Sequence, residues 1–291
     1  MTINFKSYED FHRDIAAWEQ QLPQFDAVCG VPRSGLIPAS YIATRRNIRM
    51  VDLCRLLQDP KGIIERSPLR NVNPVMRYEK SFGNRLLVVD DTSSDDSVTM
   101  SHLREVLGGF NHGLDITFAA VYRASESSKV DCCYDTIPQP RMFGWNWFRH
   151  WNLRQSMLDF DGVLCEDWKH RPEQTEDPEF LEHVTNAKPL YIPDVPVQAI
   201  VTSRLEQYRE ESEAWLKRHG VQYNALVMHP AKTPEARRAV GDHAERKAMA
   251  YAKGYKSKNT ILFVESDERQ AAKIAAITKK PVLCTDLMKM F

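Results

Sequence analysis

Seven apolar runs rich in Val, Ile and Leu recur along the chain, and each ends in a cluster of Gly, Ser, Thr or Asp. Continuous apolar runs of this kind are typical of strands buried on both faces of a parallel sheet. The runs lie at residues 26–31, 85–91, 115–122, 156–162, 197–204, 224–228 and 259–267. Amphipathic helical spacing is present at 98–108, 205–219, 243–253 and 268–278. The alternation predicts an α/β fold with parallel sheets in both halves of the chain.

A break in this alternation predicts two domains, residues 1–150 and 151–291. The segment 131–151 has no clear period and contains Pro138 and Pro140. Four aromatic residues lie within its last seven positions: Trp145, Trp147, Phe148 and Trp151. An apolar patch of this size is rarely left in water. We therefore expect the aromatic cluster to be buried, either as a core between domains or as a ligand platform.

Length and composition narrow the function classes. A chain of 291 residues is long enough for two ordinary cores. It has 39 basic and 39 acidic residues, so it lacks the basic surplus of a dedicated nucleic-acid binder. It also lacks a membrane-length apolar run and a secretory leader pattern, and its six cysteines form no C-x-x-C pair. We expect a cytoplasmic protein that neither enters a membrane nor holds structural zinc.

Two strand ends in the first half carry residues suited to binding anions. Residues 85–100 read as a buried strand ending in Asp90 and Asp91, then a loop of Ser, Thr and Asp, then a helix. Residues 25–39 read as a strand, a Pro-Arg-Ser-Gly turn carrying Arg33, and a helix. Ligands of open α/β sheets bind at the carboxyl ends of strands, where loop N–H groups and helix N-termini attract anions. We expect the two carboxylates to hold ribose hydroxyls and the loop to hold a phosphate.

Together these segments resemble the two signature segments of the type I phosphoribosyltransferases, which bind phosphoribosyl pyrophosphate. The resemblance implies that Asp90 and Asp91 contact the ribose hydroxyls, and that residues 55–83 supply a catalytic loop. It implies that the 5′-phosphate is cradled by Ser93, Ser94, Ser97 and Thr99. It further implies that the Mg²⁺-bound pyrophosphate meets Arg33, Ser34 and Gly35. The implied reaction makes or breaks an N-glycosidic bond at an oxocarbenium-like centre.

The phosphate loop departs from the family pattern. Asp95 and Asp96 stand where the family has a Thr-Gly or Ser-Gly pair, and the loop looks one residue longer. Carboxylates beside a bound phosphate repel it unless they face away or share a metal. The alternatives are therefore a working transferase or a domain of the same fold that only senses a nucleotide.

The second half places acidic, hydroxyl and basic residues in a recognisable order. A short apolar strand delivers Asp159 and Asp161, two positions apart and followed by Gly162. Later strands end in Thr202 with Ser203 and in Glu265 with Asp267, and Lys247 lies on a predicted helix between them. Paired carboxylates at a strand end suit a nucleophile with an acid/base partner. The alternative for Lys247 is a solvated helix face.

This order resembles the four motifs of the haloacid dehalogenase superfamily, whose phosphatases use Mg²⁺. The resemblance implies that Asp159 is the nucleophile, Asp161 the general acid/base, and Lys247 the charge-neutralising cation. Thr202 and Ser203 would bind the phosphate. The implied metal set is Asp159, Asp161, Glu265 and Asp267, and the choice between Glu265 and Asp267 stays open. The resemblance implies a Rossmann-like domain, and the short intervals between the motifs leave room for little or no cap.

The whole chain resembles two-domain fusions of these families, which occur in phages and in bacterial stress-response clusters. The resemblance implies a bifunctional enzyme of nucleotide, nucleoside or modified-sugar metabolism, with Mg²⁺ as cofactor. Its partners would be small molecules: phosphoribosyl pyrophosphate, a base or nucleotide, and a phosphoester. Two alternatives stay open: a phosphatase with a nucleotide-sensing first half, and a non-enzymatic nucleotide sensor. A homodimer is compatible with the sequence.

Overall fold

The computed structural model divides into two compact units. The N-terminal unit is Tyr8–Arg141, and the C-terminal unit joins residues 2–7 to Met142–Phe291. The division falls before the boundary expected near residue 150. The first residues join the C-terminal unit because strand β1 (Asn4–Lys6) pairs with β7 (Arg141–Phe143). The structure describes residues 2–60, 83–110, 112–168, 177–254 and 259–291.

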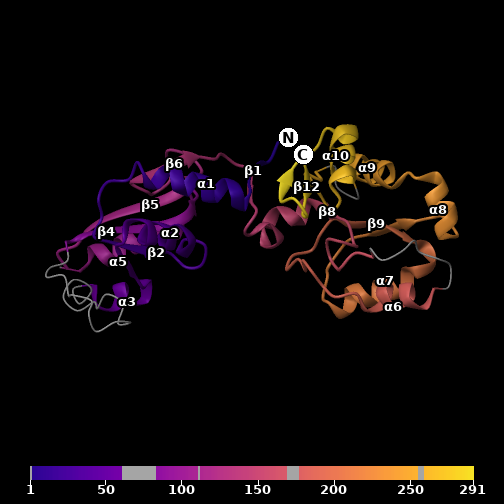
Figure 1. The fold of residues 1–291 in the computed structure, drawn as a ribbon, viewed down its shortest axis with the longest axis horizontal. Helices are drawn as coiled ribbons and strands as arrows, with labels where there is room; N and C mark the ends of the chain where they lie inside the picture. Colours follow the sequence, from indigo (N-terminus) through magenta and orange to yellow (C-terminus); the bar gives the residue numbers. More distant parts are fainter. Residues whose placement is uncertain (1, 61–82, 111, 169–176, 255–258) are drawn as a thin grey trace. The chain divides into compact units, whose positions relative to one another are not determined.

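The N-terminal unit contains a five-stranded sheet in which all neighbouring strands are parallel (Figure 1). Its strand order is β3-β2-β4-β5-β6. The strands are β2 (Ala27–Gly30), β3 (Arg49–Val51), β4 (Arg85–Ser93), β5 (Asp115–Arg123) and β6 (Cys132–Thr136). The central position of β4 places Asp90 and Asp91 in the middle of the edge formed by the strand ends.

Four described helices accompany this sheet: α1 (Tyr8–Glu19), α2 (Leu36–Arg46), α3 (Leu53–Gln58) and α5 (Val98–Gly108). Leu103 of α5 shares a buried cluster with Leu86 and Val88 of β4. Alternate side chains of a strand point to opposite faces, so this cluster occupies one face of the sheet. The loop from β4 to α5 is thereby held between two packed elements. Residues 61–82, most of the expected catalytic loop, lie outside the described residues.

The C-terminal unit contains a six-stranded sheet of order β10-β9-β8-β11-β12-β13, in which only β13 runs antiparallel to its neighbour. The strands are β8 (Ser156–Leu158), β9 (Ala199–Leu205), β10 (Leu226–His229), β11 (Leu262–Glu265), β12 (Val282–Cys284) and β13 (Lys289–Met290). Because β8 lies between β9 and β11, three of the predicted motifs end at one edge of the sheet.

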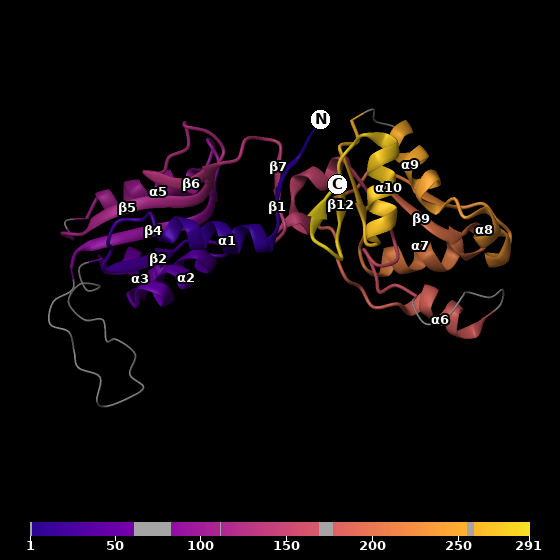
Figure 2. The ribbon, with the colours of Figure 1, turned by 45° about the horizontal axis from the view of Figure 1, so that its top comes forward.

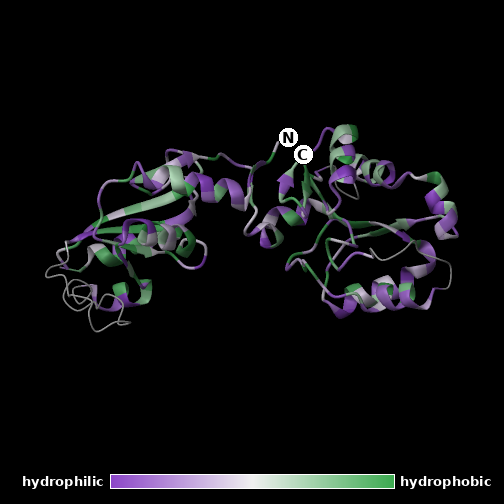
Figure 3. Cartoon of the chain, in the orientation of Figure 1, coloured by the Kyte–Doolittle hydropathy of each residue, from purple (hydrophilic) through white to green (hydrophobic). Residues whose placement is uncertain are grey.

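Both faces of this second sheet are covered. Phe263 packs on one side with α9 (His243–Lys253) and α10 (Glu268–Thr278), which lie side by side in Figure 2. Its neighbours Leu262 and Val264 pack on the other side with Trp215 of α7 (Arg209–Arg218). Figure 3 shows hydrophobic colour along much of the strands and both hydrophobic and hydrophilic colour on the helices. The remaining elements are α6 (Pro178–Asn186), α8 (Pro234–Val240) and the 3₁₀ helices η1 (Trp147–Arg149), η2 (Trp151–Gln155) and η3 (Glu206–Tyr208).

The aromatic segment divides between core and surface. Trp147 is 1% exposed and stands edge-on to Tyr191 within the core of the C-terminal unit. Trp145 is buried and stacks on Phe143. Trp151 is 55% exposed, so the expectation that the whole cluster is buried was wrong for that residue. None of the helices in the described ranges has the length and apolar character that a membrane span requires.

Candidate functional site

The two anion-binding segments of the N-terminal unit meet at one strand end. Strands β2 and β4 are paired in parallel, and the N–H of Val31 donates to the carbonyl of Val89 at 2.9 Å. A Cβ on Gly35 would lie 2.6 Å from the Val89 oxygen and 2.9 Å from the Cα of Asp90. No side chain fits at such a distance, so glycine is required there. The absence of a side chain lets the Arg33–Gly35 turn lie against Asp90.

Asp90 and Asp91 form a partly buried acidic pair. Asp91 is 7% exposed, and its N–H donates to Asp90 Oδ1 at 2.8 Å. Burial, followed by the charge of Asp91, raises the pKa of Asp90 to about 9. Asp90 therefore keeps its proton at neutral pH, because ionising it beside the charge of Asp91 is unfavourable. A hydrogen bond from a donor such as a ribose hydroxyl would stabilise the ionised form of such a pair.

The loop after β4 leaves a helix N-terminus available. Helix α5 begins at Val98 as predicted, and within the described residues Ser97 makes no side-chain capping bond. The N–H groups of a first helical turn attract anions. Ser94 and Ser97 are partly exposed here, and Thr99 is exposed. Ser93 differs, because β4 continues through it and leaves it 1% exposed.

Asp95 is held by neighbouring hydroxyls. Its Oδ1 accepts from Ser125 Oγ at 2.7 Å and from Ser128 Oγ at 3.0 Å, both on the connection after β5. Asp96 is exposed. The first carboxylate of the unusual loop therefore joins two loops together. These bonds give Asp95 a structural role that the sequence pattern did not indicate.

In the C-terminal unit the predicted residues gather at one edge of the sheet. The N–H of Asp159 donates to the carbonyl of Val264 at 2.9 Å, which places the ends of β8 and β11 together. Gly162 has a φ of 79°, and a Cβ there would lie 2.2 Å from Ser266 Oγ. A cavity of about 200 Å³ is lined by all seven predicted residues of this unit: Asp159, Asp161, Thr202, Ser203, Lys247, Glu265 and Asp267.

Lys247 is buried between two carboxylates. Its Nζ donates to Asp159 Oδ2 and to Glu265 Oε2, both at 2.7 Å, and to Gln270 Oε1 at 3.0 Å. It is 3% exposed, so it does not lie on a solvated helix face. Burial alone would lower the pKa of Lys247, but the two carboxylate charges raise it above its ordinary value. The lysine is therefore a fixed cation.

The charge around Asp159 is not fully balanced. Burial, followed by the charge of Glu265, raises the pKa of Asp159 well above its ordinary range, although Lys247 opposes this. One lysine faces two buried carboxylates. A further cation or a proton would therefore be favourable beside Asp159.

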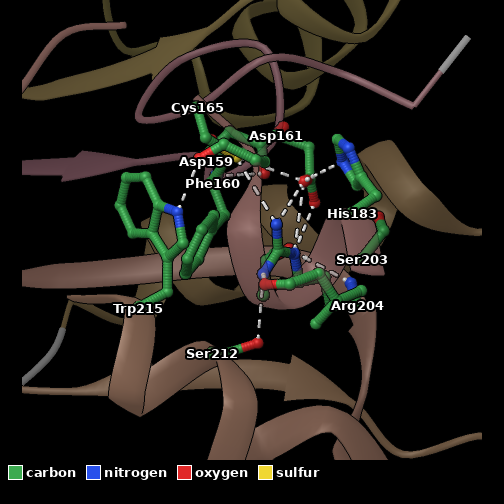
Figure 4. Close-up of polar contacts among 12 residues, drawn as sticks. Asp159, Phe160, Asp161, Cys165, His183, Ser203, Arg204, Ser212 and Trp215 are labelled. Atoms are coloured by element: carbon green, nitrogen blue, oxygen red, sulfur yellow. Dashed lines mark hydrogen bonds and ion pairs between the residues drawn. The ribbon is translucent and has the colours of Figure 1, made fainter. Parts of the chain in front are cut away.

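Asp161 has a different set of partners, drawn in Figure 4. Arg204 Nη2 donates to Asp161 Oδ1 at 2.6 Å, and Arg204 Nε donates to Oδ2 at 2.9 Å. His183 Nε2 lies 3.4 Å from Asp161 Oδ1. Burial alone would raise the pKa of Asp161, but the Arg204 charge and the hydrogen bonds from His183 and Arg204 hold it well below its usual range. Asp161 is therefore ionised.

These contacts do not assemble the expected four-carboxylate metal set. Across the described ranges, no group of three or more His, Cys, Asp and Glu side chains is arranged to hold a metal ion. Asp161 is hydrogen-bonded to Arg204, and Glu265 is hydrogen-bonded to Lys247. Asp267 Oδ1 caps α10 by accepting from the Gln270 N–H at 2.8 Å. Mg²⁺ usually binds one or two carboxylates and keeps several waters. A smaller set containing Asp159 fits that chemistry and the unbalanced charge beside it.

The sequence interpretation missed several residues of this cavity. Arg204, Arg237 and His243 line it, and His183 approaches Asp161. The position of Arg204 directly after the Thr-Ser pair was a local signal that could have been used. Arg237 of α8 and His183 of α6 gave no such signal, because only the chain path brings those helices to the strand ends.

Comparison with known proteins bears on the phosphoribosyltransferase-like part. No family model matches the chain. A xanthine-guanine phosphoribosyltransferase from Idiomarina loihiensis is 34% identical over 106 residues, which cover 35% of this chain and 63% of that protein. Part of the chain is phosphoribosyltransferase-like. The chain spans less than two thirds of the length of this relative.

Solved structures with the same kind of description align over about half of the chain. The Helicobacter pylori xanthine-guanine-hypoxanthine phosphoribosyltransferase is 16% identical, with a TM-score of 0.35, over 50% of this chain and 93% of its own. The Pyrococcus horikoshii purine phosphoribosyltransferase is 20% identical, with the same TM-score, over 50% of this chain and 94% of its own. The haloacid dehalogenase-like interpretation rests on the residues of the C-terminal unit alone.

Proposed function

We propose that this chain is a bifunctional enzyme, a phosphoribosyltransferase in its N-terminal unit and a Mg²⁺-dependent phosphatase in its C-terminal unit. The observation that carries the second activity is the contact of Lys247 with both Asp159 and Glu265 inside a small polar cavity. The first activity is supported by the 34% identity to a phosphoribosyltransferase and by the approach of Gly35 to Asp90.

In the transferase, phosphoribosyl pyrophosphate binds along the strand ends of the first sheet. Asp90 and Asp91 accept hydrogen bonds from the ribose hydroxyls, and the loop with the α5 N-terminus holds the 5′-phosphate. Arg33 in the turn after β2 faces the pyrophosphate as a cation. The nitrogen of a base attacks the anomeric carbon while pyrophosphate leaves, and positioning and charge stabilisation supply most of the rate. Purines are the first acceptor class to test, because the relative is named for xanthine and guanine.

In the phosphatase, an Asp159 carboxylate oxygen attacks phosphorus, and the ester oxygen of the substrate leaves and takes a proton from solvent. Thr202 and Ser203 donate to the phosphate, and Lys247 balances charge on the nucleophile. Water then attacks the aspartyl-phosphate, Asp161 takes its proton, and inorganic phosphate is released. When bound, Mg²⁺ offsets the negative charge shared by phosphate and carboxylate. Asp159 would hold the ion together with the exposed Asp267, whose Oδ1 also caps α10.

The hydrogen bonds of Asp95 favour the bifunctional enzyme over a nucleotide sensor. The motive for a sensor was repulsion between the acidic loop and a bound phosphate. Because Asp95 accepts from Ser125 and Ser128, its carboxylate is engaged by the connection after β5. The two hydroxyls solvate the Asp95 carboxylate and hold it against that connection, although it keeps its charge.

Separate assays of pyrophosphate and inorganic phosphate test this proposal. The whole chain is incubated with Mg²⁺, phosphoribosyl pyrophosphate and a pool of purine bases, and phosphorus NMR follows both products. Both products should appear, and phosphate release should stop in Asp159→Asn while pyrophosphate release continues. Phosphate without pyrophosphate would contradict the transferase, and pyrophosphate without phosphate would contradict the phosphatase.

A further inference from the structure

Arg204 is a buried cation at the meeting point of several elements of the C-terminal unit. It lies at the end of β9 and is 2% exposed. Beyond its three bonds to Asp161, its Nη1 donates to the carbonyl of Val184 at 3.1 Å and to Ser212 Oγ at 3.3 Å. Its guanidinium carbon lies 3.8 Å from the centre of the Phe160 ring. The guanidinium is therefore held by Asp161 through Nε and Nη2 and by Val184 and Ser212 through Nη1 (Figure 4).

These contacts restrict Asp161 to one orientation. The shortest bond of Nε is to Oδ2, and that of Nη2 is to Oδ1. Two parallel bonds of this kind prevent a carboxylate from rotating, whereas a single bond does not. The other end of the guanidinium is anchored to α6 through Val184 and to α7 through Ser212. The carboxylate is therefore positioned by groups that do not themselves belong to the predicted motifs.

We infer that Arg204 is the positioning residue for Asp161 in the second half of phosphoester hydrolysis. The inference rests on the proposed phosphatase function. Arg204 acts through Asp161 by holding its carboxylate where it can take the proton of the attacking water. In that step a water oxygen bonds to phosphorus and the bond from phosphorus to Asp159 breaks. The water proton passes to Asp161, and inorganic phosphate leaves.

The inference predicts that turnover depends on the planar shape of the Arg204 guanidinium and not only on its positive charge. A lysine has one ammonium nitrogen and cannot make the paired contacts of a planar guanidinium. A misplacement of about 1 Å in a reacting group can cost about a hundredfold in rate. Arg204→Lys and Arg204→Gln should therefore both slow turnover by about a hundredfold. Arg218→Lys is the matched control, because it makes the same change at an exposed arginine of α7 that has no bond to Asp161 among the described contacts.

Burst kinetics with 4-nitrophenyl phosphate separate the two steps. Its leaving group needs no protonation, so a defect in Asp161 should slow only hydrolysis of the aspartyl-phosphate. In both Arg204 variants we expect a rapid release of one equivalent of 4-nitrophenol, then slow turnover, with phosphate on the intact protein detected by mass. Asp161→Asn should give the same pattern, and adding Arg204→Lys to it should cause little further loss. Arg218→Lys should turn over at nearly the wild-type rate without a burst.

The outcomes distinguish this inference from the function on which it rests. A wild-type chain that hydrolyses no phosphoester would overturn both. An active wild type with no burst in Arg204→Lys, or with additive losses in the double variant, would overturn the positioning role alone. Full activity in Arg204→Lys would also overturn it, since charge would then suffice. If Arg204→Gln does not fold, Arg204→Lys decides the question because it retains the buried charge.

Discussion

The ammonium of Lys247 lies 2.7 Å from Asp159 Oδ2, although 88 residues separate them in the chain. The same ammonium contacts Glu265, which lies on a third element. A buried lysine with two carboxylate partners is costly to desolvate and is stable only with close contacts such as these. This relationship links a strand end, a helix face and a second strand end into one charged centre.

Replacing Asp159 with Asn should abolish phosphoester hydrolysis. An amide is a poor nucleophile, and loss of a covalent nucleophile costs on the order of 10⁴-fold or more in turnover. Phosphate release from 4-nitrophenyl phosphate measures the effect, with the exposed Asp194→Asn as the matched control. Ligand binding by the N-terminal unit should be unchanged. Activity within about tenfold of wild type would refute Asp159 as the nucleophile.

Replacing Lys247 with Met should destabilise the C-terminal unit by about 3–5 kcal/mol, because Asp159 and Glu265 would be left buried without their cation. Urea unfolding at neutral pH measures the loss. The deficit should shrink as the pH falls, because protonation neutralises Asp159, whose pKa is raised by burial and by the charge of Glu265. Adding Glu265→Gln should restore part of the stability. A Lys247→Met variant as stable as wild type would show that the three charges are not coupled.

The acidic pair of the N-terminal unit should give a stability that depends on pH. The pKa of Asp90 is about 9 in the folded chain, above its usual value of about 4 in an unfolded one. A carboxyl with a raised folded pKa makes the fold progressively less stable as the pH rises between these two values. Asp90→Asn removes that loss and should be more stable than wild type above about pH 4, with a gain that grows toward pH 9. A difference that is constant with pH would contradict the raised pKa.

Phosphoribosyl pyrophosphate with Mg²⁺ should raise the melting temperature of the N-terminal unit. A ligand at a hundredfold excess over its dissociation constant stabilises by about 2.7 kcal/mol. The combined change of Asp90→Asn and Asp91→Asn should remove the shift, because each carboxyl group that accepts from a ribose hydroxyl is replaced by an amide. Calorimetry of the whole chain measures each variant with and without ligand. A wild type with no shift at saturating ligand would contradict the transferase proposal.

Asp95→Ala should weaken the binding of phosphoribosyl pyrophosphate. The change removes the acceptor of Ser125 and Ser128, so the phosphate loop loses its bonds to the connection after β5. Each such bond contributes about 1 kcal/mol, more when an ionised group takes part, so a fivefold or larger loss of affinity is expected. Isothermal titration at two salt concentrations measures it, with Asp96→Ala as the control. Tighter binding in Asp95→Ala would show that its charge repels the phosphate instead.

Local sequence patterns were sufficient for most of the regular elements. The helices predicted at 98–108, 243–253 and 268–278 begin and end where α5, α9 and α10 do. The short strands β3, β6 and β12 and the helices α3, α6 and α8 were missed. Their apolar patterns are too brief to stand out, and their pairing with longer neighbours supplies the stability that local propensity does not.

The sequence by itself determined that this chain is an α/β protein with two strand-end constellations, because apolar periodicity and helix termini depend on residues a few positions apart. It also placed the residues of each constellation at the carboxyl ends of strands. Only the tertiary structure decided which charges pair. Asp161 pairs with Arg204 of β9, and Asp159 pairs with Lys247 of α9. Two of the carboxylates expected to bind one metal ion are therefore each paired with a different cation. Partners of buried charges depend on strand order and helix packing, which bring together residues that no local pattern connects.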